Sequence, residues 1–336
     1  MKVKDIAKLA NVSPATVSLV LNNKPGVSDD TRKKIYEILD KHGYSPTIVP
    51  KTEQLQGSIR FLKYKKHGLV VDQNGGFIAS VIDGVDNEAR KLGYSLVMTT
   101  LSPDNCNEVL QIVKNDCRDG IILLGTELNN QDLVFLNDIN VPIVIVDNYF
   151  EFEEYDCVVM NNVDAVFKAV QYLVELGYKD IGYFHSSFVI NNFAAREEGY
   201  KKALKLLGIE YKRENVFHLT PTLEGAYRDM QKILQTGAVL PSAVFSDNDT
   251  IAVGAIKALK EHGIKIPEQL SIIGFDDIPF CLMADPPLTT MRIFKEKIGA
   301  LAVRRLIDKI KNNDTNIIKI QIGAELIIRG STCKAR

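Results

Sequence analysis

Short apolar runs alternate with amphipathic segments of helical length from about residue 58 onward, and this alternation constrains the fold more than any other feature. The runs include SIRFLKY (58–64) continued by GLVV (68–71), then GIILLG (120–125), VPIVIVDN (141–148), DIGYFHS (180–186) and LSIIGFDD (270–277). Four amphipathic segments between such runs end in glycine, namely 77–93, 162–177, 194–208 and 250–263. Strands that alternate with helices predict an α/β fold with parallel sheets covered on both faces.

The alternating series restarts near Asn161 and covers similar ground a second time, which predicts two doubly wound subdomains. A last helical segment at 295–313 and a pair of strand-like runs at 318–331 are expected to pass back across both of them. The chain of 336 residues is also longer than one hydrophobic core usually grows. Each predicted subdomain combines two stretches of chain: 59–160 with about 291–318, and 161–290 with about 319–333.

Residues 1–45 have a different pattern, with two short helices that almost touch and a third that follows. Apolar residues repeat at helical spacing in the first two segments: Ile6, Leu9 and Ala10, then Val17, Val20 and Leu21. Ser13 before Pro14 marks the start of the second helix, because the hydroxyl caps a free N–H and proline fits the first turn. The third segment begins at Ser28 and ends at Gly43. These residues are predicted to form a small helix-turn-helix head, and 46–58 a linker.

The charge of the chain is divided unevenly between its two parts. Residues 1–66 contain 13 Lys and Arg against 6 Asp and Glu, a net charge of +7, whereas the remainder carries −8. A basic head on an acidic body indicates that the head alone meets a polyanion. Chance variation of the surface charge is the alternative interpretation.

Several classes of protein find no support in the sequence. The five cysteines are an odd number without a C-x-x-C pair, which favours reduced thiols over a metal cluster. No apolar run approaches the roughly 20 residues that cross a bilayer, and the N-terminus lacks a secretory signal. Enzyme signatures such as G-x-S-x-G or a Walker loop are missing. The sequence therefore predicts a cytoplasmic protein that is not an enzyme and uses no cofactor.

The small side chains on the second helix suit an approach to double-stranded DNA. A helix fits the major groove, and its exposed N-terminal end can reach base edges while lysines and helix-start N–H groups hold phosphates. A three-helix bundle that only packs on the body is the structural alternative.

The sequence VKDIAKLANVSPATVSLVLNNKPGVSDDTRKKIYEILDKHGYSP resembles the head of the LacI/GalR family of bacterial transcription regulators almost position by position. The resemblance continues through DGIILLG, VPIVIVDN, REEGYKKAL, SDNDTIAVGAIKAL, LSIIGFDD and PPLTTMR, in the order of that family. It implies a periplasmic-binding-protein-like body and a homodimer that binds a palindromic operator. It also implies a small-molecule effector, most often a sugar and in some relatives a nucleobase, that tunes operator affinity.

The resemblance also implies which head residues contact DNA. They are Lys4, Ser13, Pro14, Ala15, Thr16, Ser18, Leu19 and Asn22, with Pro14, Ala15 and Leu19 at the base-reading positions. Many relatives have arginine at the position of Leu19. Arginine can hold guanine with two hydrogen bonds, whereas leucine offers only apolar contact, for example to a thymine methyl group. We therefore expect a different operator base at this position.

The linker departs from the family pattern. Relatives form a hinge helix on operator DNA and insert a leucine into the minor groove, at a cost in base unstacking that extra contacts must repay. Here Pro50 lies within the matching stretch, Glu53 occupies the wedge position, and Leu55 follows two residues later. This pattern predicts that the protein bends DNA less than its relatives.

Polar residues at the ends of the predicted strands suggest a ligand cleft between the two subdomains. In doubly wound sheets ligands bind beyond the carboxyl ends of the strands, and carboxylates and amides there suit a polyhydroxylated molecule. The residues concerned are Asp72, Asn74, Asp147, Asn148, His185, Ser186, Asp247, Asn248, Asp249 and Asp276. The alternative is that several only cap the helices that follow them.

By the resemblance, Arg196 and Asp249 match ligand-binding residues, and Asp147 lies at a corresponding strand end. A salt bridge between the subdomains is their alternative role. The full predicted effector set is Phe77, Asp147, Asn192, Arg196, Asn248, Asp249 and Phe275.

Two other function classes were weighed against a DNA-binding regulator. A solute-binding receptor with a structural head predicts an export signal, which this sequence lacks. An enzyme needs a catalytic group, and the one histidine at a predicted strand end, His185, suits a ligand contact or a core hydrogen bond better than catalysis.

Overall fold

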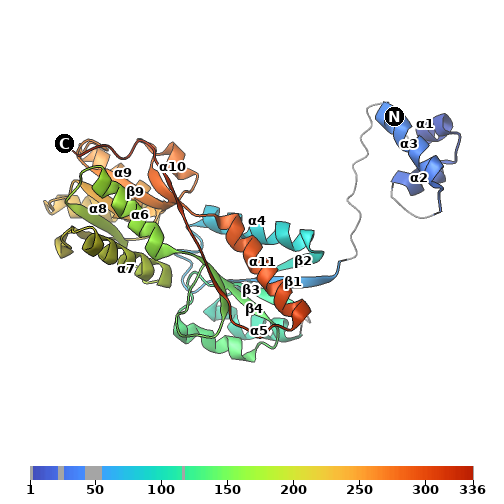
Figure 1. Ribbon diagram of the computed structural model, residues 1–336, viewed down its shortest axis with the longest axis horizontal. Helices are drawn as coiled ribbons and strands as arrows, with labels where there is room; N and C mark the ends of the chain where they lie inside the picture. The colour runs from blue at the N-terminus through green and yellow to red at the C-terminus, as the bar shows by residue number, and fades with distance from the viewer. Residues whose placement is uncertain (1–2, 22–25, 42–54, 116–117, 336) are drawn as a thin grey trace. The chain divides into compact units, whose positions relative to one another are not determined.

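The computed structural model describes residues 3–21, 26–41, 55–115 and 118–335, and it divides into two compact units, Met1–Gln56 and Gly57–Arg336 (Figure 1). We call the first unit the head and the second the body. Within the described residues, no helix combines the length and the apolar character that a membrane crossing needs. Most of the predicted linker, 46–54, lies outside the described residues, and Gly57 already begins the first strand.

The head consists of three helices around a small apolar core. They are α1 (Val3–Ala10), α2 (Pro14–Leu21) and α3 (Asp29–Lys41). The buried core residues are Ile6, Ala7, Ala10, Val17, Val20, Ile35 and Leu39. Leu9, which the sequence pattern placed on the buried face, is 53% exposed, because Ala7 lies on that face instead.

The tight turn between α1 and α2 explains how two helices follow each other with almost no loop. Asn11 has a positive φ of 56°, a conformation that asparagine tolerates better than most residues. The N–H of Val12 donates to the carbonyl of Ala7 at 3.0 Å, and the N–H of Thr16 donates to the Ser13 hydroxyl at 3.0 Å. Ser13 thus caps α2, as the sequence predicted.

The body contains two six-stranded sheets. The first has the order β11-β5-β4-β3-β1-β2 and is parallel throughout. Its strands are β1 (Gly57–Tyr64), β2 (Tyr94–Leu101), β3 (Gly120–Leu124), β4 (Ile143–Val146), β5 (Asp156–Met160) and β11 (Lys319–Ile322). The second has the order β12-β10-β9-β8-β6-β7, with only β12 antiparallel. Its strands are β6 (Ile181–Ser186), β7 (Val216–Leu219), β8 (Ala243–Ser246), β9 (Ser271–Asp276), β10 (Thr289–Arg292) and β12 (Glu325–Ile327).

Helices cover these sheets, as Figure 1 shows. They are α4 (Gly75–Lys91), α5 (Cys106–Asn115), α6 (Asn162–Glu175), α7 (Asn191–Leu206), α8 (Leu223–Gln235), α9 (Asp249–Glu261), the short α10 (Phe280–Met283) and α11 (Lys295–Asn312). Short 3₁₀ turns cover Pro103–Asn105, Asn130–Asp138 and Arg213–Asn215. The glycines predicted to end four helices all have positive φ, from 70° to 98°: Gly93, Gly177, Gly208 and Gly263.

The chain passes between the two sheets three times: after β5, after β10 and after β11. The last return of the chain was expected near residue 318, but β11 pairs with β5, so the division falls between Ile322 and Glu325. The pattern also omitted β5 and β10 and predicted a strand at 68–71. That segment is a turn, because Val70 and Val71 donate their N–H groups to the Glu127 side chain and not to a neighbouring strand.

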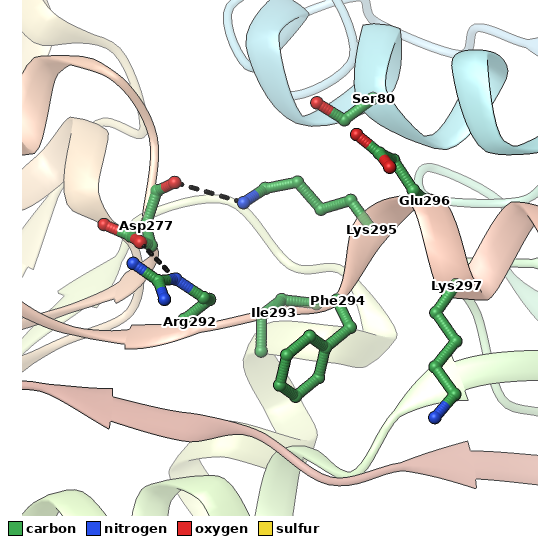
Figure 2. Close-up of a pocket in the computed structure, with 8 residues that line it drawn as sticks. All are labelled: Ser80, Asp277, Arg292, Ile293, Phe294, Lys295, Glu296 and Lys297. Carbon is green, nitrogen blue, oxygen red and sulfur yellow. Dashed lines mark hydrogen bonds and ion pairs between the residues drawn. The ribbon is translucent and has the colours of Figure 1, made fainter.

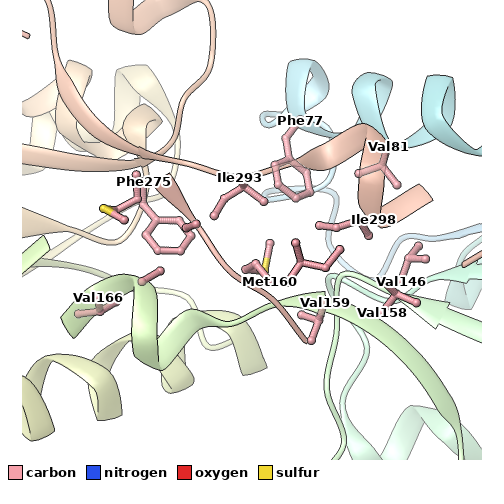
Figure 3. Close-up of a cluster of buried hydrophobic side chains, with 14 of the residues drawn as sticks. Phe77, Val81, Val146, Val158, Val159, Met160, Val166, Phe275, Ile293 and Ile298 are labelled. Carbon is pink, nitrogen blue, oxygen red and sulfur yellow. The ribbon is translucent and has the colours of Figure 1, made fainter. Parts of the chain in front are cut away.

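We call each sheet with its covering helices a lobe of the body. One hydrophobic core runs through the region where the chain crosses between the sheets, and it joins the two lobes. Phe77 of α4, Val158 of β5, Phe275 of β9 and Ile293 after β10 all belong to it (Figure 3). Helices α4 and α11 cross closely, because a Cβ on Gly84 would lie 2.1 Å from the Glu296 carbonyl oxygen. The continuous core holds the strand ends of both sheets around a shared cavity.

Candidate functional site

The predicted DNA-reading residues of the head lie on one side of α2. Pro14, Ala15 and Ser18 are exposed and Leu19 is half-buried, whereas Val17 and Val20 face the core. Thr16 is half-buried and shares a hydrogen bond of 2.8 Å with Ser13. Asn22, Pro50 and Glu53 lie outside the described residues, and Leu55 is exposed.

A hollow on the head adjoins the start of α2. Lys4 and Lys8 of α1 line it together with Asn11, Ser13 and Pro14. The positive end of a helix and two nearby lysines suit a phosphate of the DNA backbone. Lys8 and Asn11 were not among the predicted residues. Lys8 lies four residues after Lys4 on the same helix, and Asn11 lies in the turn just before Ser13, so their positions in the sequence were the available signal.

The central cavity of the body lies between the two lobes and has a volume of only about 20 Å³. The lobe of the first sheet contributes Val70, Asn74, Phe77, Thr126 and Asp147, and the lobe of the second contributes Ile190, Asn192, Phe193, Arg196, Asn248 and Asp276. The volume is below the roughly 300–1,000 Å³ of most ligand pockets. A ligand therefore displaces contacts between the lobes as it enters.

Hydrogen bonds already connect the lobes across this cavity. The amide of Asn192 donates to the carbonyl oxygen of Asp147 at 2.9 Å and to its Oδ1 at 3.0 Å. On the other side, the amide of Asn74 donates to Asp276 Oδ2 at 3.1 Å. These contacts join α7 to the end of β4, and the start of α4 to the end of β9. They are the contacts that opening of the lobes breaks.

Arg196 is buried among the residues that the lobe of the second sheet contributes to the cavity. Its Nε donates to Asn162 Oδ1 at 2.9 Å, and its Nη1 donates to the carbonyl oxygen of Asp247. Its guanidinium lies 3.8 Å from the centroid of the Phe275 ring, and its Nη2 is 3.7 Å from Asp276 Oδ1. Phe275 thus packs against the guanidinium of Arg196 and is not among the residues that line the cavity.

The two cavity carboxyl groups are held in unfavourable surroundings. Burial raises the pKa of Asp147 to about 7, against the opposing effect of the Thr126 hydroxyl, which donates to Asp147 Oδ2 at 2.5 Å. Burial also raises the pKa of Asp276, partly offset by Arg196. Both residues have positive φ, 60° and 111°, which costs backbone energy in residues other than glycine. Strain and buried charge together make this cavity a candidate binding site.

Two buried polar atoms at the cavity have no hydrogen bond within the described residues. They are Asn74 Oδ1 and Asp276 Oδ1, one from each lobe. A buried acceptor without a partner costs about 1–3 kcal/mol. Both atoms are therefore positioned to accept hydrogen bonds from a bound molecule.

The structure brings most of the predicted effector set to the cavity and leaves two members outside its lining. Those that line it are Phe77, Asp147, Asn192, Arg196 and Asn248. Asn248 also caps α9 by accepting from the N–H of Ile251 at 2.9 Å.

Asp249 lies in the core of its lobe. It accepts from the Thr290 hydroxyl at 2.6 Å and the Ile278 N–H at 3.0 Å, and its side chain is fully buried. The cavity lining thus differs here from the predicted effector set: Asp276, not Asp249, is the carboxylate of this lobe that lines the cavity.

Six residues that line the cavity were not in the predicted effector set: Val70, Asn74, Thr126, Ile190, Phe193 and Asp276. Asn74 and Asp276 were among the polar residues at strand ends, so their position carried a signal. Thr126 lies two residues after the end of β3, and the same rule points to it. Among the three apolar residues, Phe193 lies next to Asn192 in the sequence, whereas Val70 and Ile190 had no signal of their own.

Other polar groups at strand ends have structural partners. His185 Nδ1 lies 2.7 Å from Asp247 Oδ2, which also accepts from the N–H of Ser186 at 2.6 Å. Asn148 donates to the carbonyls of Gly125 and Leu128 at 2.6 and 2.9 Å. His185 is therefore a core hydrogen-bonding residue.

A second hollow, of about 330 Å³, lies beside the crossover after β10 (Figure 2). Three of its charged residues interact with one another: Arg292 lies 2.7 Å from Asp277, and Lys295 donates to the Asp277 carbonyl oxygen at 3.1 Å. The described residues hold no cluster of three or more His, Cys, Asp or Glu side chains arranged for a metal ion.

Comparison with known proteins places this architecture in a family. Residues 2–47 match the family described as bacterial regulatory proteins, lacI family, and residues 170–332 match a periplasmic binding protein-like domain. The chain is 30% identical over 334 residues to the HTH-type transcriptional repressor PurR of Actinobacillus pleuropneumoniae serotype 3 (strain JL03), covering 98% of this chain and 97% of the relative. It is 32% identical over 331 residues to the ribose operon repressor of Haemophilus influenzae (strain ATCC 51907 / DSM 11121 / KW20 / Rd), covering 98% and 97%.

A solved structure of the lac repressor dimer bound to operator and an anti-inducer shares the fold, with a TM-score of 0.72 at 22% identity over 99% of both chains. The head matches a family of regulatory proteins, and the relatives that match over nearly the whole chain are repressors. These findings count against a receptor whose head is only structural. With its helix-turn-helix head and its cavity between two lobes, the chain belongs to the lacI family of bacterial regulatory proteins and is a DNA-binding regulator with an effector-binding domain.

Proposed function

We propose that this protein is a cytoplasmic transcriptional repressor that binds a palindromic operator as a homodimer and responds to a small, uncharged, polyhydroxylated molecule in the cavity between its lobes. The observation that carries the effector class is a pair of buried acceptors without a hydrogen bond, Asn74 Oδ1 and Asp276 Oδ1, on residues that line the same cavity from opposite lobes; Asp276 Oδ1 has only the longer ion pair with Arg196. Hydroxyl groups can donate to both atoms at once.

The charge of the cavity favours a neutral ligand. The carboxyl groups of Asp147 and Asp276 stand against the single guanidinium of Arg196, whose donors already serve Asn162 and Asp247. A phosphate or carboxylate on the ligand would lie near two acidic groups in a poorly solvated site, which is costly. A neutral sugar avoids this cost. The ribose operon repressor is among the relatives, in agreement with this choice.

A neutral nucleobase is the second candidate. The rings of Phe77 and Phe193 both line the cavity and offer flat apolar faces for a planar heterocycle. The N–H groups of a base could also donate to the free acceptors.

A ligand in this position acts on the contacts between the lobes. It competes with the bonds from Asn192 to Asp147 and from Asn74 to Asp276, or adds donors that strengthen closure. Either effect changes the equilibrium between an open and a closed body. The ratio of the ligand's affinities for the two states sets how large that change can be. In the dimer, that shift changes how well two heads fit the two halves of an operator.

The apolar surface of α10 supports assembly of the body into a dimer. Phe280, Leu282 and Met283 are 50%, 66% and 81% exposed on one short helix. Large apolar side chains grouped on a surface mark protein interfaces. We propose that a second copy of the chain covers them.

A ligand panel tests the effector class. The full-length protein is heated with D-ribose, D-galactose, D-ribose 5-phosphate, D-galacturonate, adenine and hypoxanthine in turn. A ligand at 100 times its Kd stabilises the fold by about 2.7 kcal/mol. We expect a neutral sugar to raise the Tm and its charged counterpart to have no effect. A rise with only the charged members contradicts the proposal, and a rise with only the bases selects the second candidate.

A further inference from the structure

The side chain of Glu127 lies behind the loop that joins β1 to α4. It is only 5% exposed. Its two oxygens accept hydrogen bonds from five backbone N–H groups: Oε2 from Lys66, His67 and Gly68 at 2.9, 2.8 and 2.9 Å, and Oε1 from Val70 and Val71 at 2.9 and 3.0 Å. A single carboxylate thus provides the acceptors that a neighbouring strand would otherwise supply to this loop.

The carboxylate is suited to this task because it is charged. Burial opposes the charge, but the N–H groups of Val71, His67 and their neighbours outweigh it and hold the pKa of Glu127 below its usual value. Hydrogen bonds to a charged acceptor are about twice as strong as those between neutral groups. One side chain from the loop after β3 thus binds five of the N–H groups of the loop between Lys65 and Asn74.

This loop supplies a wall of the effector cavity. Val70 and Asn74 line the cavity directly, and Phe77 follows in the first turn of α4. The N–H of Asn74 donates to the Val70 carbonyl at 3.0 Å, and the N–H of Phe77 donates to the Asn74 carbonyl at 3.0 Å. Glu127 binds Val70, Val70 binds Asn74, and Asn74 binds Phe77, so the position of the Glu127 side chain affects all three residues.

We propose that Glu127 is a positioning residue for the effector cavity, whose carboxylate fixes the loop so that Asn74 reaches Asp276 across the lobes. The proposal rests on the proposed function only in assigning an effector to this cavity. Thr126, the preceding residue, donates to Asp147 at 2.5 Å. Two consecutive residues after β3 thus hold two different parts of the cavity wall.

Replacing Glu127 by glutamine tests this role with little change in size. An amide has one acceptor oxygen and one NH2 group that only donates. Either the N–H groups of Val70 and Val71 or those of Lys66, His67 and Gly68 then face a donor. The loop should loosen from its base, while the sheets on either side keep their own hydrogen bonds.

Asp156 offers a matched control in the same lobe. It is 1% exposed and accepts from Arg305 and Lys309 at 2.5 Å each and from the N–H of Ile318 at 3.1 Å. None of these partners lines the cavity. Asp156→Asn therefore also damages a buried carboxylate network, but away from the loop.

The experiment is backbone amide hydrogen exchange of the full-length protein without added ligand. In Glu127→Gln we expect exchange at residues 66–78 to be roughly 10- to 100-fold faster than in the wild type, with β3 and β8 unchanged. In Asp156→Asn we expect no acceleration confined to 66–78. Unchanged exchange in the loop of Glu127→Gln, or acceleration spread evenly over the body, overturns the proposal.

Glu127→Asp is the second variant if the glutamine variant does not fold. It keeps the charge but is one methylene shorter, so we expect a smaller acceleration at the same amides. Even acceleration across the body again overturns the proposal. The ligand panel on the wild type addresses the proposed function separately, because the exchange result does not depend on any ligand.

Discussion

The head and the body present their binding groups in opposite ways. On the head, Pro14 and Ala15 are exposed, and Ser13 bonds to Thr16 only three residues along. In the body, Asn192 bonds to Asp147 across 45 residues of sequence, and Asn74 bonds to Asp276 across 202. The head thus uses side chains that one local helix displays, whereas the cavity is a network that the whole fold assembles.

In the head, the residues proposed to bind DNA contribute little to stability. In the body, the residues proposed to bind the effector also stabilise the fold. Exposed substitutions on a helix usually change stability by less than about 0.5 kcal/mol, whereas the loss of a buried bonded group costs several times more. Operator choice can therefore change residue by residue. A change in effector choice alters the fold's own contacts.

The largest expected effect is that of Arg196→Ala. The change leaves Asn162 and Asp247 without their buried donor, removes the charge that lies 3.7 Å from Asp276, and removes the packing on Phe275. We expect the free energy of unfolding of the body to fall by about 2–5 kcal/mol, measured by urea denaturation. Arg196→Lys should recover only part of it, because lysine lacks the planar fork. A loss no greater than that of an exposed head substitution contradicts the network description.

The second effect is a pH dependence that arises from Asp147. Because the folded pKa of about 7 exceeds the usual 3.8, the folded protein holds this proton to higher pH than the unfolded chain does. Its contribution to stability is thus lost as the pH rises from about 4 to about 7, by up to about 1.4 kcal/mol per pH unit. Asp147→Asn should flatten this part of the curve in denaturation at pH 5, 6, 7 and 8. Parallel curves for the variant and the wild type contradict it.

Leu19→Arg tests the head side of the comparison. We expect the variant to prefer guanine at one position of each operator half-site, with about 1–3 kcal/mol of discrimination, because arginine can grip its O6 and N7. Selection of binding sites from a random duplex library measures this preference. Unfolding of the body should not change. An unaltered half-site in the selected sequences refutes our reading of Leu19.

The smallest effect is that of Lys4→Ala. This exposed lysine lines the hollow at the start of α2 and is positioned for a phosphate. Loss of one phosphate contact should lower the slope of log affinity against log salt by about 0.9 and weaken all operators alike. Fluorescence anisotropy over a salt series measures both quantities. A change in base preference without a change in slope would place Lys4 away from the phosphates.

The sequence predicted what depends on neighbouring residues. Ser13 caps α2 as expected, and Gly93 and Gly263 end their helices with positive φ. Such signals need only a few adjacent positions, and the same holds for the exposed face of α2. The two-sheet fold followed from the alternation of strands and helices, which repeats along the body.

The prediction failed where a distant residue decides the local structure. GLVV has the composition of a strand, but Glu127, 56 residues after Val71, takes its N–H groups. Asp249 and Asp276 both follow apolar strands, and the sequence does not show which one faces the cleft. Pairing of β9 with β10 decides it, because Thr290 of β10 meets Asp249 in the core and Asp276 ends β9 at the cavity.

Binding of the full-length protein to a palindromic duplex, selected from a random library and titrated with salt, tests the central claim most directly. The account predicts tight binding at low ionic strength that weakens steeply as salt rises, because lysines of the head release counterions from the DNA. It further predicts that a stabilising ligand from the panel changes the affinity while the slope persists. A protein that selects no duplex at low salt, with or without ligands, contradicts the account.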